Sequence, residues 1–108
     1  MGITIHLYYT GRDGSALRFA REMEASGAAD EIRAEDGNLQ YDYFLPLEGG
    51  ETVLLIDRWE SQAALDRHHA SPMMRRIARM RETYDLHMRV ERYAEAEDAG
   101  DDRRFIRD

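Results

Sequence analysis

The segment from Asp57 to Met74, DRWESQAALDRHHASPMM, gathers the side chains of this 108-residue chain that are most capable of chemistry. It holds a carboxylate, an indole, two adjacent imidazoles and a Ser-Pro pair. Trp59 could stack on a flat aromatic ligand, and Asp57 could act as a base whose pKa is raised by burial. Each also has a commoner use, because a lone Trp usually packs in a core and an Asp can pair with an arginine. We interpret the segment as the wall of a small-molecule pocket.

Four histidines are candidates for acid–base chemistry. His68 and His69 are adjacent on a predicted helix and point about 100° apart, so at most one of them faces the pocket. They lack the i, i+4 spacing of a pair of metal ligands. Either could simply be a positive charge that the helix dipole favours at the C-terminal end of the helix. His6 and His87 fall on predicted strands, and one of them could line the pocket. No spacing supports a metal site, so no metal is predicted.

Composition excludes several classes of function. The net charge is −7, which argues against nucleic acid as a partner because phosphate binding needs a basic surface. The chain has no cysteine, which excludes disulfides and thiolate chemistry and is compatible with the cytoplasm. All 15 basic residues are arginine, so a lysine Schiff base is impossible. No apolar run is long enough to span a membrane and the N-terminus lacks signal-peptide features, so we expect a cytoplasmic protein with no membrane partner.

Hydrophobic periodicity predicts a β-α-β-β-α-β order. Strands are expected at 3–9, 38–45, 52–59 and 85–94, and helices at 16–26, 28–35, 62–69 and from Pro72 onward. Ser15, Ser61 and Ser71 are the expected N-caps, and Gly27 the expected helix end. This order is typical of an α+β, ferredoxin-like fold, in which helices cover one face of an antiparallel four-stranded sheet. We expect one domain over 1–94 and a charged tail over 95–108 that is mobile or packs on a partner subunit.

Alternation along the strands separates two faces of the sheet. Ile5, Leu7 and Tyr9 share one face of the first strand, which we expect the helices to cover, whereas His6 and Tyr8 share the other. The uncovered face is expected to carry the pocket and an apolar patch, with these members: Tyr8, Tyr41 or Phe44, Leu55 and Trp59. Two such faces packed together in a two-fold dimer would cover the patch and leave a cavity in each half.

Three motifs resemble the antibiotic biosynthesis monooxygenase (quinol monooxygenase-like) family, whose members form a dimeric α+β barrel. They are Asp-Gly-Asn-Leu-x-Tyr at 36–41, acidic-x-Trp at 57–59, and Ala-Leu-x-x-His-x-x-Ser-Pro at 64–72. The resemblance covers roughly residues 3 to 94, and the third motif is the most specific. It implies a homodimer that oxygenates an electron-rich aromatic molecule with O2 and no cofactor.

The resemblance also implies roles for particular residues. His68 matches the family's pocket histidine and would be a general base, and Asn38 would donate to a developing oxyanion. Trp59, Tyr41, Asp57, His6 and Met73 are the predicted substrate-binding residues. At Met73 the chain departs from the family, because many members carry a second histidine after Ser-Pro.

Two alternatives remain open at this point. The first is a dimer that binds or isomerises a small molecule without oxygenase activity, since a fold does not fix a function. The second is a purely structural dimer, which would have no cavity and would gain no stability from ligands.

Overall fold

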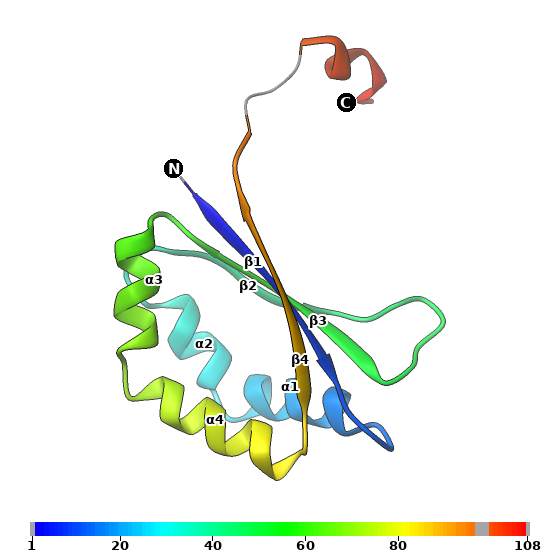
Figure 1. Ribbon diagram of the computed structural model, residues 1–108, viewed down its shortest axis with the longest axis vertical. Helices are drawn as coiled ribbons and strands as arrows, with labels where there is room; N and C mark the ends of the chain where they lie inside the picture. The colour runs from blue at the N-terminus through cyan, green and yellow to red at the C-terminus, as the bar shows by residue number, and fades with distance from the viewer. Residues whose placement is uncertain (1, 97–99, 108) are drawn as a thin grey trace.

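The computed structural model describes residues 2–96 and 100–107, and it places helices against one face of a four-stranded antiparallel sheet (Figure 1). The strands lie in the order β2-β3-β1-β4. This confirms the ferredoxin-like α+β fold. The elements are β1 (Ile3–Thr10), α1 (Ser15–Ala25), α2 (Ala28–Arg33), β2 (Asn38–Phe44), β3 (Thr52–Trp59), α3 (Gln62–His69), α4 (Met73–Thr83), β4 (His87–Ala94) and the 3₁₀ turn η1 (Gly100–Phe105).

The register of β1 on β3 decides which residues face the helices. Ile5 lies opposite Asp57 and Leu7 lies opposite Leu55, and directly opposed residues of an antiparallel pair point to the same face. Because Ile5 and Leu7 are in the helix-covered core, Leu55 and Asp57 are there too. Trp59 follows on the same side and is fully buried.

The predicted division of the sheet faces was therefore partly wrong. Leu55, Trp59 and Tyr41 lie on the helix-covered side, whereas Tyr8 and Phe44 lie on the open side. Alternation gives the faces within one strand, but only the register between strands tells which face of β3 continues the core face of β1. The pocket was expected on the open face of the sheet, but the residues predicted to line it, Asp57 and Tyr41, lie on the helix-covered face.

Of the three serines that were expected to be helix N-caps, only Ser61 is one. Ser61 Oγ accepts a hydrogen bond from Ala64 N at 3.1 Å, which confirms it as the N-cap of α3. Ser15 is instead the first residue of α1, and its Oγ accepts from Arg12 N. Ser71 Oγ donates to the His68 carbonyl at 2.7 Å, and Pro72 takes the N-cap position of α4. Ser71 therefore ties α4 to the end of α3.

Gly37 sets the turn that delivers the chain from α2 to β2. Its φ is +87°, and a Cβ at this position would lie 2.5 Å from the Ala64 Cβ. Its carbonyl accepts from Glu60 N at 2.8 Å, so it holds the ends of β2 and β3 together. The turn is thus locked against α3 by contact as well as by backbone conformation.

Replacing Gly37 with alanine should lower the free energy of unfolding by roughly 2–4 kcal/mol, because strain from a left-handed conformation adds to a steric clash. Gly49→Ala is the matched control: its φ is +77° but nothing lies within 4 Å of its Cβ position. It should lose only the conformational part, about 1 kcal/mol. Urea denaturation measures both, and equal losses would show that the contact with Ala64 is unimportant.

The C-terminal segment follows β4. The described tail forms η1 beyond β4, away from the helices, with Phe105 and Ile106 exposed (Figure 1). Its mobility or packing on a partner remains a prediction. None of the described helices has the length and apolar character needed to cross a membrane.

Candidate active site

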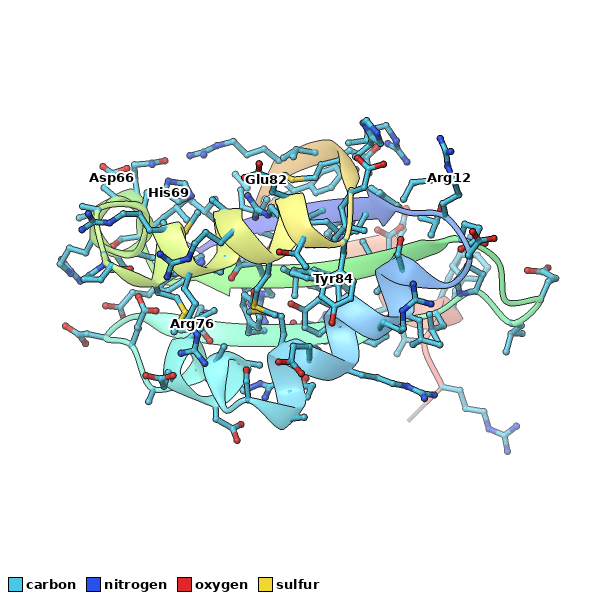
Figure 2. All side chains as sticks on the ribbon, turned by 90° about the horizontal axis from the view of Figure 1, so that it is seen from below. Arg12, Asp66, His69, Arg76, Glu82 and Tyr84 are labelled. Carbon is cyan, nitrogen blue, oxygen red and sulfur yellow. The ribbon has the colours of Figure 1, made fainter. Side chains whose placement is uncertain are left out.

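A cavity of about 290 Å³ lies between the sheet and the helices α3 and α4. Figure 2 looks onto this helix layer, with α4 in front of the sheet and running along the strands, and with His69 where α3 approaches α4. The lining is mostly apolar with a few charged groups, as is usual for small-molecule sites. Its members are Ile5, Leu7, Tyr41, Leu55, Asp57, Leu65, His68, His69, Met74, Ile77, Arg81, Met88, Val90 and Arg92.

His68 is fixed from two sides. It lies in the last turn of α3, on the same buried stripe as Ala64 and Leu65, and is only 4% exposed. Its ring is stacked on Trp59, with centroids 4.8 Å apart and planes 28° apart. Its Nδ1 lies 3.0 and 3.1 Å from the two carboxylate oxygens of Glu35. Nε2 makes no hydrogen bond within the described residues and is the ring nitrogen available to a ligand.

Glu35 reaches His68 from the turn that follows α2. Its amide donates to the Ile32 carbonyl at 3.0 Å, and its carbonyl accepts from Asn38 N at 3.1 Å. The turn is therefore fixed by backbone hydrogen bonds before the side chain is placed. A carboxylate on Nδ1 favours the tautomer with hydrogen on that nitrogen, which leaves Nε2 free to accept a proton.

Asp57 is a buried carboxyl group in the cavity lining. Burial raises its pKa from 3.8 to about 7, and this rise is partly offset by the nearby Trp59 indole N–H and increased by Glu35. The indole makes no hydrogen bond of normal geometry, and Asp57 Oδ1 is likewise buried without a partner within the described residues. Buried polar groups are normally satisfied. Asp57 belongs to the cavity lining, so its unpartnered oxygen is available to a ligand or a water molecule, whereas the Trp59 indole is enclosed by protein.

Two pairs of polar groups border the cavity. The Tyr41 and Tyr43 hydroxyls are 3.3 Å apart, and burial raises the pKa of Tyr41 well above its ordinary value. Tyr41 is therefore a neutral phenol and not a base. Arg81 Nη2 donates to the Tyr9 hydroxyl at 2.8 Å, while Arg81 Nε is buried without a partner within the described residues.

The structure brings some of the predicted site residues together. His68, Tyr41 and Asp57 all line the cavity. Trp59 does not, because it is fully buried behind the His68 ring; its predicted stacking on a substrate is replaced by stacking on the imidazole. Met73 packs against the core, and the neighbouring Met74 is the methionine that lines the cavity.

Two predicted site residues lie elsewhere. The Asn38 amide nitrogen donates to the Gln40 and Arg58 carbonyls, each at 3.3 Å, where β2 bulges against β3. Asn38 is thus committed to the backbone and does not line the cavity. His6 lies on the open face, edge-on to Tyr93 at 5.0 Å between ring centroids. Its predicted place with Trp59 is wrong, because the cavity is on the opposite side of β1.

The structure also places the two remaining histidines and adds two residues, Glu35 and Arg81, that were not predicted from the sequence. His69 lines the cavity beside His68, whereas His87 is exposed at the start of β4. Glu35 was missed because nothing local links it to a histidine 33 positions away. Arg81 could have been found, since it follows Ile77 by four residues and must share its helix face. Within the described residues no cluster of His, Asp and Glu could hold a metal ion.

A second hollow of about 550 Å³ lies against α1, β2 and β3. It is lined by Leu17, Ala20, Arg21, Glu24, Ala25, Tyr43, Leu45 and Val53. Although larger, it contains no histidine and no buried carboxyl group. The acid–base chemistry is therefore concentrated in the smaller cavity.

Comparison with known proteins identifies the family of the chain. Residues 2–80 match the family model described as antibiotic biosynthesis monooxygenase. The chain belongs to the antibiotic biosynthesis monooxygenase family. The matched stretch extends from β1 into α4 and includes both His68 and Glu35.

Two relatives carry the name "Putative monooxygenase". Rv0793 of Mycobacterium tuberculosis is 50% identical over 40 residues, which is 37% of this chain and 39% of that protein. YcnE of Bacillus subtilis is 35% identical over 46 residues, which is 43% of this chain and 48% of that protein. The aligned part thus spans less than half of either relative.

Solved structures of antibiotic biosynthesis monooxygenase type share the fold over nearly the whole chain. Rv0793 superposes with a TM-score of 0.75 at 24% identity, covering 93% of this chain and all of that one. SnoaB of Streptomyces nogalater, described as a cofactor-independent oxygenase, superposes with a TM-score of 0.74 at 13% identity. That match covers 92% of this chain and 97% of SnoaB. At these identities the superpositions show the fold alone.

Proposed function

We propose that the protein is a cofactor-independent monooxygenase that oxidises an electron-rich aromatic molecule, of the quinol or polyphenol type, with O2. The observation that carries this proposal is His68, a buried imidazole in an apolar cavity, held by Glu35 on one nitrogen and open to a ligand on the other. Membership of the monooxygenase family supports the reaction class. The cavity volume is sufficient for a small aromatic ligand.

In the proposed mechanism a substrate hydroxyl gives its proton to His68 Nε2. Glu35 stabilises the imidazolium that forms, because its carboxylate already lies at Nδ1. The resulting aryl oxide is electron-rich enough to transfer an electron to O2. Apolar residues such as Leu55, Leu65 and Ile77 exclude water from the reacting carbon.

The atoms balance for a simple test substrate. In 1,4-dihydroxynaphthalene a ring C–H is replaced by a C–O bond from O2, and the other oxygen atom leaves as water. The product is 2-hydroxy-1,4-naphthoquinone, and the substrate supplies all four electrons. No external reductant is required.

Glu35→Gln should lower kcat by about tenfold and leave KM nearly unchanged, since its partner His68 would lose the charge that stabilises the imidazolium. A neutral amide can accept from Nδ1–H or donate to Nδ1, so ¹⁵N NMR of the imidazole should show a mixture of tautomers. Glu31→Gln, on α2 and paired with Arg76, is the control and should change neither quantity. An unaltered tautomer in Glu35→Gln would argue that Glu35 does not position His68.

We propose that the open face of the sheet pairs with a second copy of the chain. Tyr8, Leu54 and Ile56 are only partly buried there, and Phe44 and Tyr93 are exposed. An apolar and aromatic surface of this kind usually marks an interface. Light scattering should give twice the mass of the 12.6 kDa chain; a monomer at micromolar concentration would contradict the pairing.

The alternative is a protein that binds or isomerises a small molecule without using O2. Met73, at the place where many family members have a histidine, is the observation that favours it. Turnover of the same ligand under anaerobic and aerobic conditions separates the two functions. Conversion that continues without O2 would establish the alternative.

A further inference from the structure

Two arginines line the cavity, and no carboxylate pairs with either of them within the described residues. Arg81, from α4, bonds only the Tyr9 hydroxyl, and its Nε is buried without a partner. Arg92, from β4, bonds only the side-chain oxygen of Gln62, a neutral amide. The two cavity arginines are therefore a local excess of positive charge.

The electrostatics of neighbouring groups agree with this excess. The pKa of His69 is lowered by burial first, and then by His68, Arg81 and Arg92 against the opposing effect of Asp66. Asp57 is the only carboxyl group in the lining, and burial keeps it partly protonated near pH 7. The lining itself thus offers two arginines against one partly protonated carboxyl group, while the nearby Glu35 carboxylate is already engaged by His68.

A partly buried guanidinium without a counter-ion is costly, and an anionic ligand removes that cost. Guanidinium groups also match carboxylates by geometry, because two parallel N–H groups can contact both oxygens. Arg81 is one turn beyond Ile77, whereas His68 enters the same cavity from α3. One ligand could therefore contact both residues.

We propose that the substrate is an aromatic carboxylate, whose carboxylate is bound by Arg81 and Arg92 while its hydroxyl-bearing ring reaches His68. The reaction of the ring rests on the proposed monooxygenase function, but the recognition of the carboxylate does not. A hydroxyaryl carboxylic acid is the substrate class that matches both the arginines and the imidazole of the lining. Neutral polyphenols of the same size would bind more weakly.

Calorimetric titration with 2-naphthoate and 2-naphthamide tests this recognition without any turnover. The two molecules have nearly the same shape and differ in charge. The wild-type protein should bind the carboxylate at least about tenfold more tightly, since hydrogen bonds to charged groups contribute more than neutral ones. The preference should shrink as NaCl is raised, because Arg92 is exposed at the rim.

Arg81→Gln should weaken 2-naphthoate about tenfold and leave 2-naphthamide within about twofold. Arg79→Gln is the matched control, since it removes the same charge from an exposed position on the same helix. Tyr9→Phe removes the hydrogen bond to Arg81 but keeps the guanidinium, so it should retain the preference for the carboxylate. Arg81→Lys keeps the charge without the planar fork and should retain only part of the preference, which provides a second readout if Arg81→Gln does not fold.

Three results would overturn the proposal. They are equal binding of the two probes by the wild-type protein, no binding of 2-naphthoate, and an equal loss for both probes in Arg81→Gln. Failure of the monooxygenase proposal looks different. In that case 2-naphthoate binds with the expected preference, while no hydroxyaryl substrate consumes O2.

Discussion

Replacing His68 with glutamine should lower the rate of O2 consumption with 1,4-dihydroxynaphthalene by about 10²- to 10⁴-fold, the usual contribution of a general base. Glutamine nearly keeps the volume packed against Trp59 and can still hydrogen-bond to Glu35. It cannot take a proton from the substrate. The loss should therefore appear in kcat, with the fold intact by circular dichroism.

The matched control is His87→Gln, which removes an exposed imidazole at the start of β4. Its rate should equal that of the wild-type protein after the uncatalysed oxidation is subtracted. If His68→Gln retains more than about half of the wild-type rate, the imidazole is not the base. Activity would then have to depend on Asp57 or on the cavity alone.

Asp57→Asn should make the protein more stable at alkaline pH, by an amount that grows with pH. The pKa of the buried Asp57 is about 7, against 3.8 in its ordinary state. A group whose pKa is raised by folding stabilises the folded state below its unfolded pKa, and this contribution is lost as the pH rises through the folded pKa. The wild-type protein must ionise a buried carboxyl group above pH 7, whereas the variant has nothing to ionise.

The expected size follows from the two pKa values. Between pH 5 and pH 8, the stability of Asp57→Asn relative to wild type should rise by about 2–3 kcal/mol. Urea denaturation at the two pH values measures it. Glu48→Gln, exposed in the loop between β2 and β3, should show no comparable change because its carboxyl group meets solvent in both states. A pH-independent difference for Asp57→Asn would mean that Asp57 is not buried as the structure places it.

The sequence was sufficient to predict the element order, because each element has its own local pattern. The strand at 52–59 was predicted to the residue, and the Ser61 cap and the Gly27 helix end were confirmed. Ser71 was misassigned because Ser before Pro fits two local geometries. Its hydroxyl turns back to the His68 carbonyl and does not face the α4 amides.

The site was harder to predict because it depends on distant parts of the chain. Trp59 and Asp57 were correctly placed on one face of β3, but that face was assigned to the wrong side of the sheet. Only the pairing of Asp57 with Ile5, across more than 50 positions, decides it. The role of Asn38 was wrongly predicted for a related reason. Its side-chain amide donates to the Arg58 carbonyl at a bulge that exists only when β2 and β3 are paired.

The carboxylate that orients His68 illustrates the same limit. Glu35 lies in a turn with no periodicity of its own, and its partner is on a different helix. Two residues further on, Gly37 lies close to Ala64 in α3, so the same turn is packed against the helix that carries His68. Family resemblance identified His68, but neither resemblance nor spacing indicated how the imidazole is held.

Isotope labelling in ¹⁸O2 tests whether this cavity performs a monooxygenation. Chelator-treated wild-type protein and His68→Gln are each incubated with 1,4-dihydroxynaphthalene, and the product is analysed by mass spectrometry. We expect the wild-type protein to form 2-hydroxy-1,4-naphthoquinone with one ¹⁸O atom, at a rate that exceeds both the variant and the protein-free blank. Unlabelled 1,4-naphthoquinone with hydrogen peroxide, or labelled product at the blank rate, would contradict the proposed function.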